Sequence, residues 1–339
     1  MILRILKSNH QVNYLFLVLF GVAFWSGSLI KPELYPFYEG EGGNILFYPI
    51  HNLLENFALA NVIVSLVLVL TLAVFIQQIN NRYSVIQERS KLPALTFVIM
   101  VGGLMGVHTL HPVFFAGIFL VLAIYRLFSA FDQTKPYSAS FDSGFLLGIG
   151  SLFYFNLLIL LPAFIMGIGV LGREIRWRVF AIQFIGVLLP FIFGLSFSVF
   201  TDSFLEIIKV YEQNIVTPNN YLKANFILQA YLGCLILLFI IGNIVIVRYY
   251  DTKKISSRKF ISVFFLIFVF STAGFIFVPS TSQEMLIIIF IPVSYLVSNL
   301  LTDFKRRFWS NLILLFLLAI VTFINIYSFT GMDWDLLPK

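Results

Sequence analysis

The chain has 339 residues, of which 60% are hydrophobic, 17% aromatic and only 11% charged. Soluble domains carry about 25% charged residues. This composition therefore excludes an ordinary soluble protein and indicates an integral membrane protein surrounded by lipid. The net charge of +6 would suggest a nucleic-acid partner for a soluble protein. Here the basic residues fall between long apolar stretches, and we therefore expect membrane lipids, and no nucleic acid, as partners.

Long apolar stretches recur along the whole chain. A helix needs about 20 apolar residues to cross a hydrocarbon core of about 30 Å. Asn156 and Pro162 interrupt the run 143–172, which we interpret as a hairpin of two short spans. The predicted fold class is all-α, a polytopic transmembrane helix bundle with about eleven spans. These spans are expected near residues 12–30, 57–76, 93–109, 112–129, 143–157, 158–172, 179–199, 224–247, 260–279, 284–302 and 308–328.

The basic residues predict how this bundle is oriented. With the N-terminus inside, the cytoplasmic segments hold 18 of the 22 Lys and Arg residues. Such an imbalance is what the positive-inside rule requires, so we expect a cytoplasmic N-terminus and an outside C-terminus. The expected location is the bacterial inner (plasma) membrane, with multiple crossings. The basic residues left outside are Lys31, Lys209, Lys223 and Lys339.

No soluble domain is evident, so residues 1–339 are predicted to form a single transmembrane domain. Its two longer outside loops are 31–56 and 201–223, and both mix aromatic with charged residues. Within them, Ile45–Asn56 and Ser203–Glu212 are each predicted to form an amphipathic helix on the membrane surface. Gly102-Gly103-x-x-Gly106 and Gly144-x-x-x-Gly148 are predicted to be faces where helices pack closely.

The first outside loop carries three carboxylates on a stretch bent by Pro and Gly, namely Glu33, Glu39 and Glu41. A carboxylate close to the bilayer, partly desolvated by neighbouring Tyr and Phe, holds a proton more readily and suits the role of general base. The alternative is a solvated acidic turn. We take these three residues as the candidate catalytic residues.

Three of the four histidines, His51, His108 and His111, fall on the same predicted outside face. His51 and Glu55 are four residues apart, so a helix puts them on one side. The candidates for substrate binding on this face are His51, Glu55, His108 and His111. Imidazoles and carboxylates together can bind a divalent cation. Their spacing matches no known ligand pattern, so we predict no metal ligands, and a divalent cofactor stays an open alternative.

A basic and aromatic connector, Gly172–Arg178, is predicted on the cytoplasmic side. Its Arg173, Arg176 and Arg178 suit anchoring to lipid headgroups, or a specific contact with a lipid phosphate. We add the three arginines to the substrate-binding candidates.

Two resemblances can be stated on these residues. The stretches Phe141–Tyr154 and Gly172–Arg178 resemble an uncharacterised family of bacterial inner-membrane proteins that spans the whole chain and has no established activity. The layout is also similar to that of the GT-C glycosyltransferases, which take a sugar from a polyprenyl-phosphate carrier at the outer face. That similarity implies a polyprenyl-phosphate-linked substrate and gives Glu33, Glu39 or Glu41 the place of the acidic catalytic residue in the first outside loop. The family's signature has Asp there, whereas this loop has only Glu.

Three functions remain open for the chain, and the sequence leaves undecided whether it is an enzyme. A GT-C-like glycosyltransferase predicts a cavity that opens at the outer face. A transporter or flippase for a lipid-linked or small hydrophobic substrate predicts a polar cavity among the spans. A noncatalytic membrane assembly subunit predicts no cavity.

Overall fold

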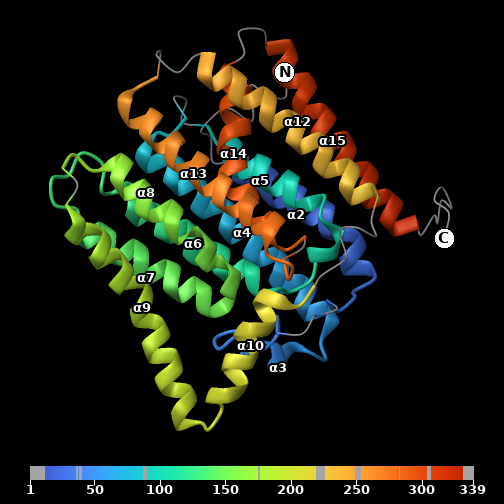
Figure 1. Cartoon of the computed structure of the whole chain (residues 1–339). Helices are drawn as coiled ribbons and strands as arrows, with labels where there is room; N and C mark the ends of the chain where they lie inside the picture. Colours follow the sequence, from blue (N-terminus) through green and yellow to red (C-terminus); the bar gives the residue numbers. More distant parts are fainter. Residues whose placement is uncertain are drawn as a thin grey trace.

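A computed structural model of the chain has only α-helices and short 3₁₀-helices among the residues that it describes (Figure 1). These residues are 12–35, 37, 40–86, 90–174, 176–218, 226–248, 253–281, 283–303 and 307–330. The α-helices are α2 (Val12–Ile30), α3 (Tyr48–Leu54), α4 (Ala58–Tyr83), α5 (Leu92–Gly102), α6 (Pro112–Phe128), α7 (Tyr137–Phe153), α8 (Leu161–Leu171), α9 (Trp177–Phe200), α10 (Phe204–Val216), α12 (Phe226–Arg248), α13 (Ile255–Phe277), α14 (Met285–Asp303) and α15 (Arg307–Thr330).

The all-α prediction is confirmed, and among the described residues a helix covers the larger part of each of the eleven predicted apolar segments. The expected hairpin in 143–172 is present, since α7 ends at Phe153 and a 3₁₀-helix, η2 (Phe155–Leu160), leads into α8. Five helices of the described part are long and apolar enough to cross a membrane, as expected for an integral membrane protein. They are Ala58–Tyr83, Trp177–Phe200, Ile255–Phe277, Met285–Thr302 and Phe308–Thr330.

Helix α14 forms the centre of the bundle. Its apolar segment is 94% buried, compared with 22% for α15 and 28% for α9, so α9 and α15 lie at the periphery. α14 packs against α5, α12 and α13. The hydroxyl groups of Thr96 on α5 and Ser298 on α14 are hydrogen-bonded at 3.0 Å, which gives polar atoms inside this apolar contact a partner.

Helices α7 and α9 pack most closely at glycines. A Cβ atom added at Gly144 would lie 2.2 Å from the carbonyl oxygen of Gln183, and one at Gly148 would lie 2.6 Å from that of Val187. Gly186 on α9 makes the reciprocal approach to the carbonyl oxygen of Phe141. The small residues let the two backbones touch, as predicted for the Gly144-x-x-x-Gly148 face.

Helices α3 and α10 lie together at one end of the bundle, which we call the α3–α10 end (Figure 1). The two segments predicted to be amphipathic helices, Ile45–Asn56 and Ser203–Glu212, are helical over Tyr48–Leu54 and Phe204–Val216. The connection from α2 to α3 also lies here and turns at Gly40, whose φ of 92° is open to glycine and strained for other residues. Asn214 of α10 donates a hydrogen bond to the Gly40 carbonyl at 3.0 Å, so α10 holds this turn in place.

Candidate functional site

A polar cavity of about 430 Å³ lies at the C-terminal end of α2. Lys31 and Glu33 directly follow α2 and line this cavity, together with His108 from the α5–α6 connection and Gln283 from the α13–α14 connection. The Glu33 side chain is exposed. The cavity thus brings a carboxylate, an ammonium group and an imidazole to one place.

His108 is held in the wall of this cavity by α2 and α4. Its ring stacks on the Trp25 indole, with ring centroids 4.0 Å apart, and its Nδ1 lies 3.3 Å from the Ser28 hydroxyl. The His108 carbonyl accepts hydrogen bonds from Trp25 Nε1 at 3.2 Å and from Ser65 Oγ at 2.8 Å. Both the ring and the backbone of His108 are therefore fixed before any ligand binds.

An apolar groove of about 500 Å³ runs between α2 and α15, which pack against each other. Gly27 and Phe329 line both this groove and the polar cavity, so the two volumes adjoin. The Lys31 ammonium lies 5.1 Å from the centroid of the Phe329 ring, at their junction. A molecule with a polar head and a hydrocarbon chain matches the chemistry of the joined volumes.

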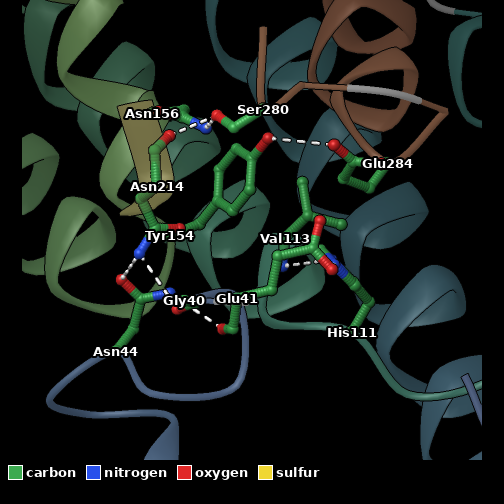
Figure 2. Close-up of polar contacts among 10 residues, drawn as sticks. All are labelled: Gly40, Glu41, Asn44, His111, Val113, Tyr154, Asn156, Asn214, Ser280 and Glu284. Carbon is green, nitrogen blue, oxygen red and sulfur yellow. Dashed lines mark hydrogen bonds and ion pairs between the residues drawn. The ribbon is translucent and has the colours of Figure 1, made fainter. Parts of the chain in front are cut away.

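A second polar site, which we call the buried cluster, consists of Glu41, His111, Tyr154 and Glu284 (Figure 2). His111 Nε2 lies 3.9 Å from Glu41 Oε2. The Tyr154 hydroxyl donates to Glu284 Oε1 at 3.4 Å. Four separate segments supply these side chains: the α2–α3 connection, the N-cap of α6, the end of α7 and the residue before α14.

His111 is the N-cap of α6, and this role fixes its tautomer. Its Nδ1 accepts the backbone N–H of Val113 at 3.2 Å, and Pro112 supplies the first helical residue, as is common at helix starts. A neutral imidazole that accepts at Nδ1 carries its proton on Nε2. The Nε2–H donor therefore faces the Glu41 carboxylate.

Burial governs the protonation of His111. Removal from water lowers its pKa from 6.5 to about 4, and the nearby Glu284 carboxylate acts in the opposite direction. At neutral pH the imidazole is therefore uncharged and supplies one hydrogen-bond donor.

A hydrogen-bond network fastens the α2–α3 connection to the buried cluster (Figure 2). Asn44 donates to the Glu41 carbonyl at 2.9 Å. The Ser280 hydroxyl donates to the Asn214 carbonyl and accepts from Asn156 Nδ2, the latter at 3.2 Å. Because Asn214 also holds Gly40, segments far apart in the chain set the position of Glu41.

Tyr35 connects the buried cluster with the cavities. Its ring centroid lies 4.8 Å from that of His111, in an edge-on contact. Tyr35 also lines the polar cavity and a smaller cavity of about 210 Å³, whose wall includes His51 and Glu55. This buried tyrosine therefore stands between His111 and both open volumes.

The structure separates the residues that the sequence suggested for one outer site. Glu33 and His108 line the polar cavity, Glu41 and His111 belong to the buried cluster, and Glu39 lies outside the described residues. His51 and Glu55 share the smaller cavity, as their helical spacing indicated. The exposed side chains of Arg173, Arg176 and Arg178 follow the C-terminal end of α8, away from these cavities.

Several residues of the two sites were missed by sequence reasoning. Tyr154, Ser280 and Gln283 are neutral polar residues at helix ends or in connections, and Asn214 lies on the amphipathic helix α10. Nothing in their spacing marks them as site residues. The sequence did single out Glu284, because it is the sole acidic residue between Asp251 and Asp303 and stands beside a long apolar segment. Among the described residues, no three His, Cys, Asp or Glu side chains lie close enough to hold a metal ion.

Comparison with known proteins identifies a family. The model of a family of unknown function, DUF6427, matches residues 43–331. This match confirms the resemblance to an uncharacterised family, and because the function of that family is unknown, the match assigns no activity to the chain. No curated protein matches the chain, and no solved structure matches it. Since the match covers most of the sequence, the chain belongs to the DUF6427 family.

Proposed function

We propose that this protein is a membrane glycosyltransferase of GT-C-like layout that takes a sugar from a polyprenyl-phosphate carrier. One observation carries the proposal: the polar cavity with Lys31, Glu33 and His108 adjoins the apolar groove between α2 and α15. The groove suits the hydrocarbon chain of the carrier, because burial of apolar surface stabilises binding. The cavity suits its phosphate and sugar, since charged groups need polar partners.

Within this function Glu33 is the general base, because it is the loop carboxylate that lines the cavity. Glu33 removes the proton from the acceptor hydroxyl, whose oxygen forms the new bond to the anomeric carbon of the sugar. The bond from that carbon to the carrier phosphate breaks, and the phosphate leaves with the electron pair. The Lys31 ammonium stabilises the charge that develops on the leaving phosphate.

The proposal includes the orientation of the chain. All eleven apolar helices cross the inner membrane of a bacterium as one transmembrane domain, with the N-terminus in the cytoplasm and the C-terminus outside. The distribution of Lys and Arg supports this arrangement. The α3–α10 end then lies outside, where the cavity is open to a carrier-linked sugar.

Sugar transfer in proteoliposomes tests the proposed activity. Purified full-length protein is given radiolabelled polyprenyl-phosphate sugars and a mixed set of acceptors. Wild type should transfer label, and Glu33→Gln should lower the rate about 100-fold or more, the size expected for loss of a general base. Glu206→Gln, a change at an exposed residue on α10, is the matched control and should keep the rate. A Glu33→Gln variant as active as wild type would reject the assigned base.

A transporter or flippase for a lipid-linked substrate is the second candidate. The buried cluster favours it, because titratable side chains inside a helix bundle are characteristic of proton-coupled transport. It predicts movement of a fluorescent lipid-linked sugar across the vesicle membrane with the sugar still attached, whereas the enzyme predicts release of the carrier phosphate. The cavities disfavour a noncatalytic assembly subunit, for which no cavity is expected.

A further inference from the structure

The smaller cavity, of about 210 Å³, has no part in the proposed sugar transfer. It adjoins the polar cavity, since Leu34, Tyr35 and Thr109 line both volumes. Another part of its wall comes from His51 on α3 and from Glu55, which follows that helix. The cavity therefore lies at the α3–α10 end of the bundle (Figure 1).

Aromatic rings form a continuous part of the wall of this cavity. The Phe37 ring centroid lies 5.0 Å from that of Tyr35 and 4.7 Å from that of His51, and both contacts are edge-on. Phe47, which is fully buried, packs against Phe37 and His51, with its centroid 5.9 Å from each of theirs. Because successive rings are inclined by 62° and 70°, they form corners rather than a flat stack. A wall built in this way can touch a bound group on more than one side.

Asn61 of α4 fixes the position of the carboxylate in this cavity. Its side-chain amide donates to the Leu54 carbonyl at 2.7 Å and to the Phe57 carbonyl at 3.2 Å. These two hydrogen bonds hold the end of α3 and the turn that contains Glu55. The Glu55 side chain is exposed, whereas Tyr35 is buried. The carboxylate therefore lies toward the open side of the cavity, and the tyrosine ring lies deeper.

The charged groups favour a positively charged ligand here. Among the described residues that line this cavity, Glu55 is the sole acidic residue and no Lys or Arg is present. Lys31 lines the polar cavity instead, with its ammonium group 5.1 Å from the Phe329 ring centroid at the junction with the groove. A metal ion is disfavoured, because one carboxylate does not supply the several oxygen ligands that Ca²⁺ or Mg²⁺ takes.

We propose that the smaller cavity binds a quaternary ammonium group of the choline type. The faces of Tyr35 and Phe37 contact its methyl groups, and the Glu55 carboxylate balances its charge. A cation is attracted to the faces of aromatic rings, and quaternary ammonium groups are the ligands for which proteins most often use several rings together. Such a group donates no hydrogen bond from its nitrogen, so a wall of rings leaves none of its needs unmet. Its source is a lipid headgroup or a water-soluble choline compound.

Binding of radiolabelled choline to the full-length protein tests this site. The protein is placed in nanodiscs of phosphatidylglycerol at mildly alkaline pH, where imidazoles are ordinarily uncharged, and empty nanodiscs give the baseline. Unlabelled choline should displace the label at least about tenfold more effectively than dimethylbutanol, its neutral isostere with carbon in place of nitrogen. This comparison uses wild type and does not depend on how any variant folds.

Two variants test the assigned residues. Glu55→Gln should lower the affinity for choline about tenfold, and Phe37→Leu, which removes a ring but keeps an apolar side chain, should lower it about threefold or more. The matched controls on α10 are Glu206→Gln and Phe204→Leu, which lie outside the lining of this cavity and should bind as wild type does. Nanodiscs of phosphatidylcholine distinguish the sources, because a lipid headgroup in the cavity lowers the apparent affinity for choline and a soluble ligand leaves it unchanged.

Three results would overturn the site: wild type that binds no choline above the baseline, equal displacement by choline and its neutral isostere, or an unchanged affinity in Glu55→Gln. Since no sugar donor is present, the outcome is separate from that of the sugar-transfer assay. Choline binding without sugar transfer would count against the enzyme and leave the ammonium site standing.

Discussion

Trp25 of α2 and His108 of the α5–α6 connection form a stacked pair, with ring planes inclined by 18°. The Trp25 indole nitrogen also donates to the Ser65 hydroxyl of α4 at 3.0 Å. One fully buried side chain thus joins three segments at the wall of the polar cavity. The geometry of the cavity therefore depends on packing within the bundle.

Replacement of Trp25 should lower the stability of the folded protein. Trp25→Phe removes a buried hydrogen-bond donor and part of a close-packed ring, which together should lower stability by about 1–3 kcal/mol. The measurement is the thermal unfolding midpoint of purified protein in detergent. Trp177→Phe, at a position that is 73% exposed, is the matched control and should stay close to wild type. Equal midpoints for the two variants would contradict the role given to Trp25.

The glycine contact between α7 and α9 makes a second prediction. Gly144→Ala places a methyl group against the Gln183 carbonyl, so the helices must separate, at a cost of about 1–3 kcal/mol. Gly233→Ala has nothing within 4 Å of the added methyl group and should be neutral or slightly stabilising, since Ala suits a helix interior better than Gly. Unfolding midpoints of the two variants in the same detergent decide between these outcomes, and a tolerated Gly144→Ala would refute the close contact.

The stability of the protein should depend on pH through His111. Its folded-state pKa, about 4, lies below the ordinary value of 6.5, so the unfolded chain binds the proton first as the pH falls. This contribution to stability is complete above pH 6.5 and is lost progressively down to about pH 4.

His111→Asn isolates this effect, because Asn can still cap α6 but does not titrate. The unfolding midpoint of the variant should fall less steeply than that of wild type across the same pH window. Parallel curves for the two proteins would mean that folding does not change the pKa of His111, and would contradict its burial as a neutral group.

The groove between α2 and α15 should bind lipid. Thr322 lines it, and Thr322→Trp should fill part of the volume and reduce the polyprenyl phosphate that stays bound through purification about tenfold, equivalent to about 1.4 kcal/mol. Native mass spectrometry measures the bound fraction. Leu315→Trp adds the same ring at an exposed position of α15 outside the groove and should leave binding intact. Similar losses in both variants would point to a general effect on α15.

Cysteine labelling tests the orientation. The chain has one cysteine, Cys234, and Cys234→Ser provides a background for single exposed cysteines. Glu55→Cys after α3 should react with a membrane-impermeant maleimide in intact cells, and Lys135→Cys between α6 and α7 should react only after permeabilisation. The reverse pattern would invert the proposed topology.

The helices could be predicted from the sequence because each depends on local properties. Apolar stretches of sufficient length recur, and the breaks at Asn156 and Pro162 fall where η2 leads into α8. Close helix contacts could also be predicted where glycines repeat every four residues, as at Gly144 and Gly148. These features need no knowledge of distant parts of the chain.

The division of the site could not be predicted, since it depends on distant contacts. Glu33 and Glu41 are eight residues apart in one loop, yet only Glu33 lines the polar cavity. The turn at Gly40 separates them, and Asn214, 174 residues away, fixes that turn. Glu284 likewise meets Tyr154 across 130 residues. No local pattern encodes either pairing.

Photocrosslinking tests most directly the claim that the polar cavity and the adjoining groove bind a polyprenyl-phosphate carrier. A polyprenyl phosphate with a diazirine in its hydrocarbon chain is irradiated with the full-length protein in proteoliposomes, and the labelled peptides are identified by mass spectrometry. We predict label on α2 and α15 around Ala23 and Ile326, both of which line the groove, and competition by unlabelled carrier. Label spread over peripheral helices such as α9, unaffected by unlabelled carrier, would contradict the claim.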